Sequence, residues 1–154
     1  MSDTATPEID REALVTGYLR FAEALGRGVP DDTAEMEAAD DAYRAVAKFI
    51  THGPARLAWD LVVNILRRAP DDRLDVYAAG PLEDLVRCHG VELVNLIEHE
   101  AARDERFRWA LGCVWLTVGE LPAVTMERIV RASDGEIKPL DPGAIPPHRD
   151  PPHN

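Results

Sequence analysis

The residues with the clearest potential for chemistry lie close together in the middle of the chain. The stretch Gly80-Pro81-Leu82-Glu83-Asp84 is followed by His89. Two carboxylates and an imidazole are groups that acid–base catalysis or a metal site requires. Glu83 and Asp84 fall in the first turn of a predicted helix, where the helix dipole favours acidic side chains, and His89 falls near its end. Residues five or six apart on a helix point in different directions, so helix capping is the favoured interpretation and a shared site needs a second helix.

Asp60 is a fourth candidate, on a helix predicted for residues 54–69 that is apolar nearly all round. Asp60, Asn64 and Arg67 form the one polar strip of that helix, and we expect this strip to face solvent or a groove. A buried carboxylate is costly unless it is paired, so we expect Asp60 to be exposed.

The stretch Glu98-His99-Glu100 suggests a metal site at first sight. The helical zinc pattern needs a second histidine four residues on, and that position holds Arg103. The pattern therefore fails, and a solvated helix face is expected. The sequence predicts no metal site and no cofactor.

Candidate partner-binding residues lie elsewhere. Glu37, Asp40 and Asp41 lie away from the apolar stripe of their predicted helix, as a solvated face or a docking surface for a basic protein would. Trp109 lies off the main stripe of its own helix and is expected to reach a surface or a second interface.

Helical periodicity dominates the chain, and turn residues divide it. The first three helices are predicted over 8–25, from Pro30 to about 52 with a cap at Asp32 and Glu35, and over 54–69. A short helix then ends at Gly80, and two more run from Pro81 to Gly90 and from beyond Gly90 to about 101. The last two are predicted over 104–118 and from Pro122 to Gly135. The prediction is an all-α fold, an irregular multi-helix bundle or helical-hairpin array of about seven or eight helices. Residues 1–137 form one domain in this prediction, and residues 138–154 form a flexible, disordered Pro-rich tail.

Composition narrows the possible partners. The 154 residues include 28 acidic and 17 basic side chains, for a net charge of −11. Such a chain repels phosphates, so nucleic acid and anionic membrane surfaces are not expected as partners, whereas a basic protein is compatible. Its two cysteines do not form a disulfide framework, the start lacks the features of a signal peptide, and a cytoplasmic location is expected.

Several short motifs are shared with a known family. They are Ala58-Trp59, Ala69-Pro70-Asp71-Asp72, the segment from Ala79 to Leu85, His89-Gly90, Phe107-Arg108 and Val114-Trp115. On these motifs the block 57–115, a little over a third of the chain, resembles an uncharacterised bacterial family known only as a domain of unknown function. The resemblance implies a helical, bacterial protein and carries no activity with it.

The functional prediction follows from charge and from the motifs that are missing. The sequence has no Gly-rich phosphate loop, nucleophile elbow or paired-cysteine motif, which disfavours an enzyme of a standard class. We therefore expect a protein–protein interaction module, for example an acidic immunity- or antitoxin-type protein or an adaptor, that binds a basic protein. One alternative is a small enzyme or metal-binding domain centred on Glu83, Asp84 and His89. Another is a homodimeric structural protein that associates through exposed apolar surface such as Trp109.

Overall fold

The protein is all-α, as predicted. The computed structural model describes residues 10–145, and these form α1 (Arg11–Arg27), α2 (Ala34–His52), α3 (Ala55–Arg68), α4 (Leu74–Tyr77), α5 (Glu83–Arg103), α6 (Glu105–Gly112) and α7 (Ala123–Ala132). Six of these helices have eight or more residues, slightly fewer than the seven or eight predicted. Within residues 10–145 there is no strand, only an isolated bridge between Thr117 and Leu140.

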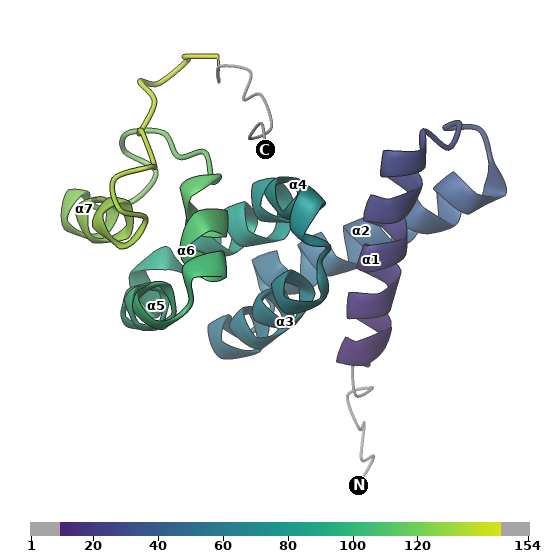
Figure 1. The fold of residues 1–154 in the computed structure, drawn as a ribbon, viewed down its shortest axis with the longest axis horizontal. Coiled ribbons are helices and arrows are strands. Elements are labelled where there is room, and N and C mark those ends of the chain that lie inside the picture. Colours follow the sequence, from purple (N-terminus) through teal and green to yellow (C-terminus); the bar gives the residue numbers. More distant parts are fainter. Residues whose placement is uncertain (1–9, 146–154) are drawn as a thin grey trace, which may run out of the picture.

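Helices α1 and α2 pack against each other at one end of the molecule, where α2 crosses behind α1 (Figure 1). Asp10 caps α1 by accepting a hydrogen bond from the Ala13 N–H at 3.2 Å. The cap of α2 is Thr33, whose hydroxyl accepts from the Met36 N–H at 3.2 Å, so the predicted cap at Asp32 is wrong by one residue. Thr33 has the extended backbone that a cap needs.

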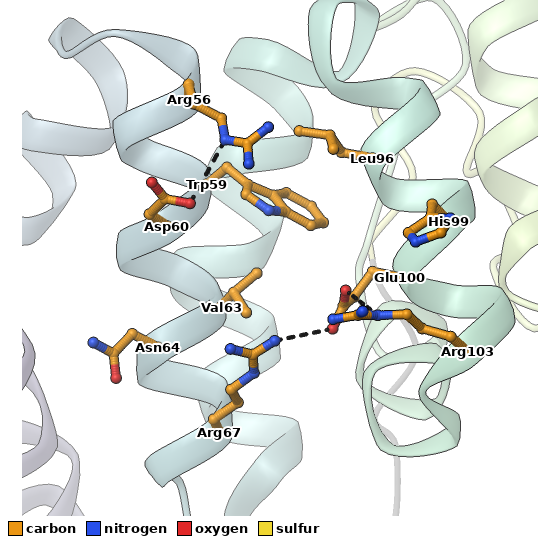
Figure 2. A pocket seen from close by; sticks show the side chains of 10 residues that line it. All are labelled: Arg56, Trp59, Asp60, Val63, Asn64, Arg67, Leu96, His99, Glu100 and Arg103. Carbon is orange, nitrogen blue, oxygen red and sulfur yellow. Dashed lines mark hydrogen bonds and ion pairs between the residues drawn. The ribbon is translucent and has the colours of Figure 1, made fainter.

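Helix α3 lies between α1 and α5 (Figure 1), and it carries much of the core. Ala58, Val62 and Ile65 have no exposed surface, and Leu61 is also buried. A helix that is apolar over most of its circumference belongs in the interior, as the sequence indicated. Of the polar strip, Arg67 points toward α5, whereas Asn64 points away from it (Figure 2).

One continuous helical run, rather than three separate helices, connects Leu74 to Arg103. The predicted breaks at Gly80 and Pro81 coincide with a π-helical turn, Ala78–Leu82, whose wider hydrogen-bonding pattern accommodates a proline inside the helix. Gly90 does not end α5 either. A Cβ atom there would lie 3.3 Å from a Leu121 methyl group, so this glycine allows close packing rather than a turn.

The helix predicted for 104–118 ends at Gly112. Residues 113–122 contain no helix, and part of their backbone pairs with Leu140 instead. Leu140 donates to the Leu116 carbonyl at 2.9 Å and accepts from the Val118 N–H at 2.8 Å. The first residues of the predicted tail therefore pack on the domain, and residues 146–154 lie outside the described residues. No helix within 10–145 is both long and apolar enough to cross a membrane.

Candidate functional site: a polar groove between α3 and α5

The side chains of Glu83 and His89 make separate contacts to separate elements. Glu83 is buried, and its carboxylate contacts Arg87 Nη1 at 2.5 Å and accepts from the Trp115 N–H at 2.9 Å. The Nε2 atom of His89 lies 2.7 Å from the Ile50 carbonyl oxygen, on α2. Both side chains thus connect α5 to its neighbours, and no contact joins them to each other among the described interactions.

Burial raises the pKa values of both carboxyls at the start of α5. For Glu83 the hydrogen bond from the Trp115 N–H and the charge of Arg87 oppose this effect without cancelling it. For Asp84 the opposing influence is Arg87 alone. These carboxyls are therefore partly desolvated, which is compatible with a chemical role as well as with the structural one just described.

A concave site lies between α3 and α5, and we call it the α3–α5 groove (Figure 2). Its volume is about 540 Å³. It is lined by Arg56, Trp59, Asp60, Val63, Asn64, Arg67, Leu96, His99, Glu100 and Arg103. Neither Glu83, Asp84 nor His89 lines it.

Helical spacing explains why these side chains share one groove. The lining residues of α3 recur at intervals of three and four, from Arg56 through Asp60 to Arg67, and those of α5 do the same from Leu96 to Arg103. Residues at this spacing lie on one face of a helix. Because α3 and α5 pack side by side, their two polar faces border one groove, with the Trp59 ring between them (Figure 2).

Glu100 is the buried charge of the groove. Its side chain is 8% exposed, and its carboxylate lies 2.9 Å from Arg103 Nε and 3.5 Å from Arg67 Nη2. A buried carboxylate needs such partners to be tolerated. The prediction that the stretch from Glu98 to Glu100 is a solvated face is therefore wrong for Glu100, because α3 covers that side of α5.

Asp60 lies at the other end of the groove from Glu100, and its ion pairs are longer than those of Glu100. Its side chain is 45% exposed, as expected, and its carboxylate lies 3.7 Å from Arg56 and 3.9 Å from Arg11. Such long, solvated ion pairs contribute little to stability. The Arg56 guanidinium therefore keeps most of its donors available to a ligand.

The chemistry that the groove offers is anion recognition. Three guanidiniums and two carboxylates line it, in a chain whose net charge is −11. A guanidinium has five N–H donors, so each arginine can hold a ligand oxygen while it keeps its intramolecular partner. Across residues 10–145 there is no group of three or more His, Cys, Asp or Glu side chains that fits a metal ion.

The predicted partner-binding residues lie away from this groove. Glu37 and Asp41 are exposed on α2, and Asp40 is half-buried. Trp109 on α6 is 41% exposed, which agrees with its position off the apolar stripe. The structure contains no partner chain, so docking at these residues stays a prediction.

Sequence reasoning identified one side of the groove and missed the other. Asp60, Asn64 and Arg67 stood out as a polar strip on an apolar helix. Glu100 and Arg103 were considered only within a failed metal pattern and were expected on a solvated face, because the sequence does not show that α3 covers that side of α5. The available signal lay on α3, where Arg56, Asp60 and Arg67 recur at helical spacing on one face.

Fold and site together define an all-helical protein with an arginine-lined groove between two of its helices. A family of unknown function (DUF6869) matches residues 31–137, which is more than half of the chain, and the chain belongs to this family. The match includes α2 to α7 and therefore the whole groove. No curated protein and no solved structure gives a significant match.

Proposed function

We propose that this protein is a binding module that recognises an anionic group, a carboxylate or a phosphate, in the α3–α5 groove. The observation that carries the proposal is the convergence of Arg56, Arg67 and Arg103 on one cavity of about 540 Å³ in a strongly acidic chain. Scattered surface arginines would need no explanation, but three from two helices around one hollow form a local positive site.

The surroundings of the arginines support binding through both charge and shape. Trp59 is 6% exposed and offers the edge of a rigid aromatic surface beside the guanidiniums. Pockets that combine an apolar wall with a few polar groups are the usual form of ligand sites. Arg67 is 59% exposed and lies 3.5 Å from Glu100, so it can turn to a ligand without loss of a short bond.

Binding rather than catalysis is the better-supported role, because the groove offers no activated nucleophile. Its lining contains no serine, threonine or cysteine, and its buried carboxylate is shared by two guanidiniums. An acid–base reaction would need a carboxylate or imidazole with a defined partner aimed at a substrate position. We therefore assign no reaction to the groove.

The test is a calorimetric titration of the full chain with citrate and, separately, with pyrophosphate. We expect Arg67→Gln to weaken the preferred anion about tenfold, since one charge-assisted hydrogen bond contributes about 1.5–3 kcal/mol. Arg44→Gln is the matched control, because Arg44 is exposed on α2 and does not line the groove. Equal affinities for the wild type and both variants would refute the proposal, and the preferred probe separates carboxylate from phosphate recognition.

A second proposal keeps the interaction with a basic protein and places it on α2. It is supported by Glu37, Asp40 and Asp41, which form no ion pair with any residue in the described part of the chain. Charged groups without internal partners favour electrostatic steering of an opposite charge. A pull-down with Glu37→Lys/Asp41→Lys as bait should lose any basic protein that the wild type retains at low salt. Retention of the same protein by both baits would exclude α2 as the docking face.

A further inference from the structure

A second arginine-lined hollow lies on the other side of α5, and we call it the α5–α7 groove. Its volume is about 280 Å³. It is lined by Glu98, Ala101, Ala102, Arg108, Arg128, Arg131, Ala132 and Asp134. Helix α5 thus separates two grooves, each with three arginines and two carboxylates.

Helix geometry places the two grooves on either side of one exposed ridge. Successive residues of an α-helix are rotated by about 100°, so Glu100 and Arg103 face the α3 side while Glu98 and Ala101 face the α7 side. Between these two directions point Asn95, His99 and Ala102, all of which are exposed. A ligand on this ridge can therefore reach both grooves without passing through the protein.

The arginines of the α5–α7 groove differ in how firmly they are held. Two carboxylate oxygens of Glu98 bind Arg128 at 2.7 and 2.5 Å, and Arg128 also donates to Asn95 at 2.7 Å on the ridge. Arg108 lies 3.1 Å from the Asp134 carboxylate and donates to a backbone carbonyl.

Of the three arginines in this groove, Arg131 makes the fewest ion pairs and hydrogen bonds within residues 10–145. It is 75% exposed, and among residues 10–145 its ion pair is to Glu127 at 4.0 Å. Its donors are therefore available to a ligand that crosses from the ridge.

We propose that an acidic polypeptide segment lies across α5, with one carboxylate in the α3–α5 groove and a second in the α5–α7 groove. The proposal rests on the proposed function of the α3–α5 groove and adds the kind of partner. A helix with its side chains is about 10–12 Å wide, which separates the two positions by more than one small anion can span. An extended polypeptide covers this distance in about four residues at 3.3 Å each.

Charge complementarity supports a peptide with spaced acidic residues rather than a uniform polyanion. The positive groups lie in two grooves, whereas the ridge between them carries Asn95, His99 and Ala102 and no arginine. Each groove also keeps two carboxylates that would repel a continuous row of phosphates. Arginine recognises a single carboxylate with two parallel hydrogen bonds, which suits isolated acidic side chains.

The test measures fluorescence anisotropy of two labelled peptides on the full chain. One peptide has two glutamates about four residues apart in a Gly/Ser background, to match the width of the ridge, and the other has them adjacent. We expect the spaced peptide to bind more tightly and to lose about tenfold in affinity with either Arg67→Gln or Arg131→Gln, as each removes one charge-assisted contact. Arg44→Gln, outside both grooves, should leave the affinities for the spaced peptide and for citrate unchanged.

The outcomes separate the two proposals. If Arg131→Gln binds the spaced peptide as the wild type does, or both peptides bind equally, the crossing mode is wrong while the anion site in the α3–α5 groove stands. If Arg67→Gln changes neither citrate nor peptide affinity, the proposed function fails as well. An oligouridylate that binds more tightly than the spaced peptide and needs both arginines would replace the peptide with nucleic acid.

Discussion

Glu100 determines how much positive charge the α3–α5 groove presents. Its carboxylate is buried between Arg67 and Arg103, at 3.5 and 2.9 Å, and it neutralises part of both guanidiniums. The same side chain that makes the groove stable therefore competes with any anion that enters it. This competition gives a test in which stability and binding change in opposite directions.

We predict that Glu100→Gln binds citrate about fivefold to tenfold more tightly than the wild type, because both guanidiniums lose a competing charge. The free energy of unfolding should fall by about 1–3 kcal/mol, since two charge-assisted hydrogen bonds are weakened. Calorimetry and urea unfolding measure the two effects. Glu105→Gln, at an exposed carboxylate on α6, is the control. A folded Glu100→Gln protein with weaker citrate binding would contradict the assignment of Glu100.

Asp84 gives a prediction about pH. Burial raises the pKa of this carboxyl, so the folded protein holds the proton more tightly than the unfolded chain does. Its contribution to the free energy of unfolding therefore rises as pH falls from above the folded pKa to below the unfolded one. We expect Asp84→Asn to gain less stability than the wild type between neutral and mildly acidic pH in urea unfolding. Asp72→Asn, at an exposed residue, should follow the wild type, and an equal gain in all three proteins would contradict the argument.

At the scale of elements, the π-helical turn before α5 depends on Gly80. A Cβ atom at this position would lie 2.7 Å from the Tyr18 hydroxyl oxygen. Tyr18 is buried and in ring contact with Phe21, Tyr43 and Tyr77, so it has little room to move away.

Gly80→Ala should therefore lower the free energy of unfolding by about 1–3 kcal/mol, the usual cost of overpacking. Thermal or urea unfolding measures the loss. Tyr18→Phe removes the clashing oxygen, so the double variant should lose less than the two single losses added together. Additive losses would show that Gly80 is needed for some reason other than Tyr18.

Arg87 connects α5 to the non-helical segment between α6 and α7. It contacts Glu83 at 2.5 Å and Glu120 at 3.1 Å, and it donates to the Trp115 carbonyl at 3.0 Å. Removal of the guanidinium leaves the buried Glu83 carboxylate without its cation.

We predict that Arg87→Ala lowers the free energy of unfolding by about 2–4 kcal/mol. Amide hydrogen exchange should become faster from Val114 to Leu121 before it does in α3. Glu120→Gln, which removes only the exposed partner, should cost less than about 1 kcal/mol. Equal losses for the two variants would mean that Glu83 does not depend on Arg87.

The sequence predicted the helices better than their junctions. Amphipathic spacing placed α1, α2, α3 and α7 close to their observed bounds because each helix buries one continuous face. Gly80, Pro81 and Gly90 were interpreted as breaks because these residues usually end helices. Tertiary contacts determine their actual roles, namely space for Tyr18, a widened turn, and close packing of α5 on α7.

At the scale of the whole molecule, arginine side chains gather on both sides of α5. Six of them line the two grooves beside α5, although the chain as a whole has a net charge of −11. Composition alone predicted a basic partner, because a net charge does not reveal how charges gather in space. A groove between two helices depends on which faces meet, and single-helix patterns do not contain that information.

The most direct measurement is a heteronuclear NMR titration of the full chain with citrate, in which the three indole N–H signals are followed. Trp59 lines the α3–α5 groove, whereas Trp109 is more exposed and lies outside it. We predict that the Trp59 signal moves progressively to saturation while the Trp109 signal stays in place, and that Arg67→Gln shifts the midpoint to about tenfold higher citrate. A titration that moves the Trp109 signal and leaves Trp59 unchanged, or moves neither, would contradict anion recognition in this groove.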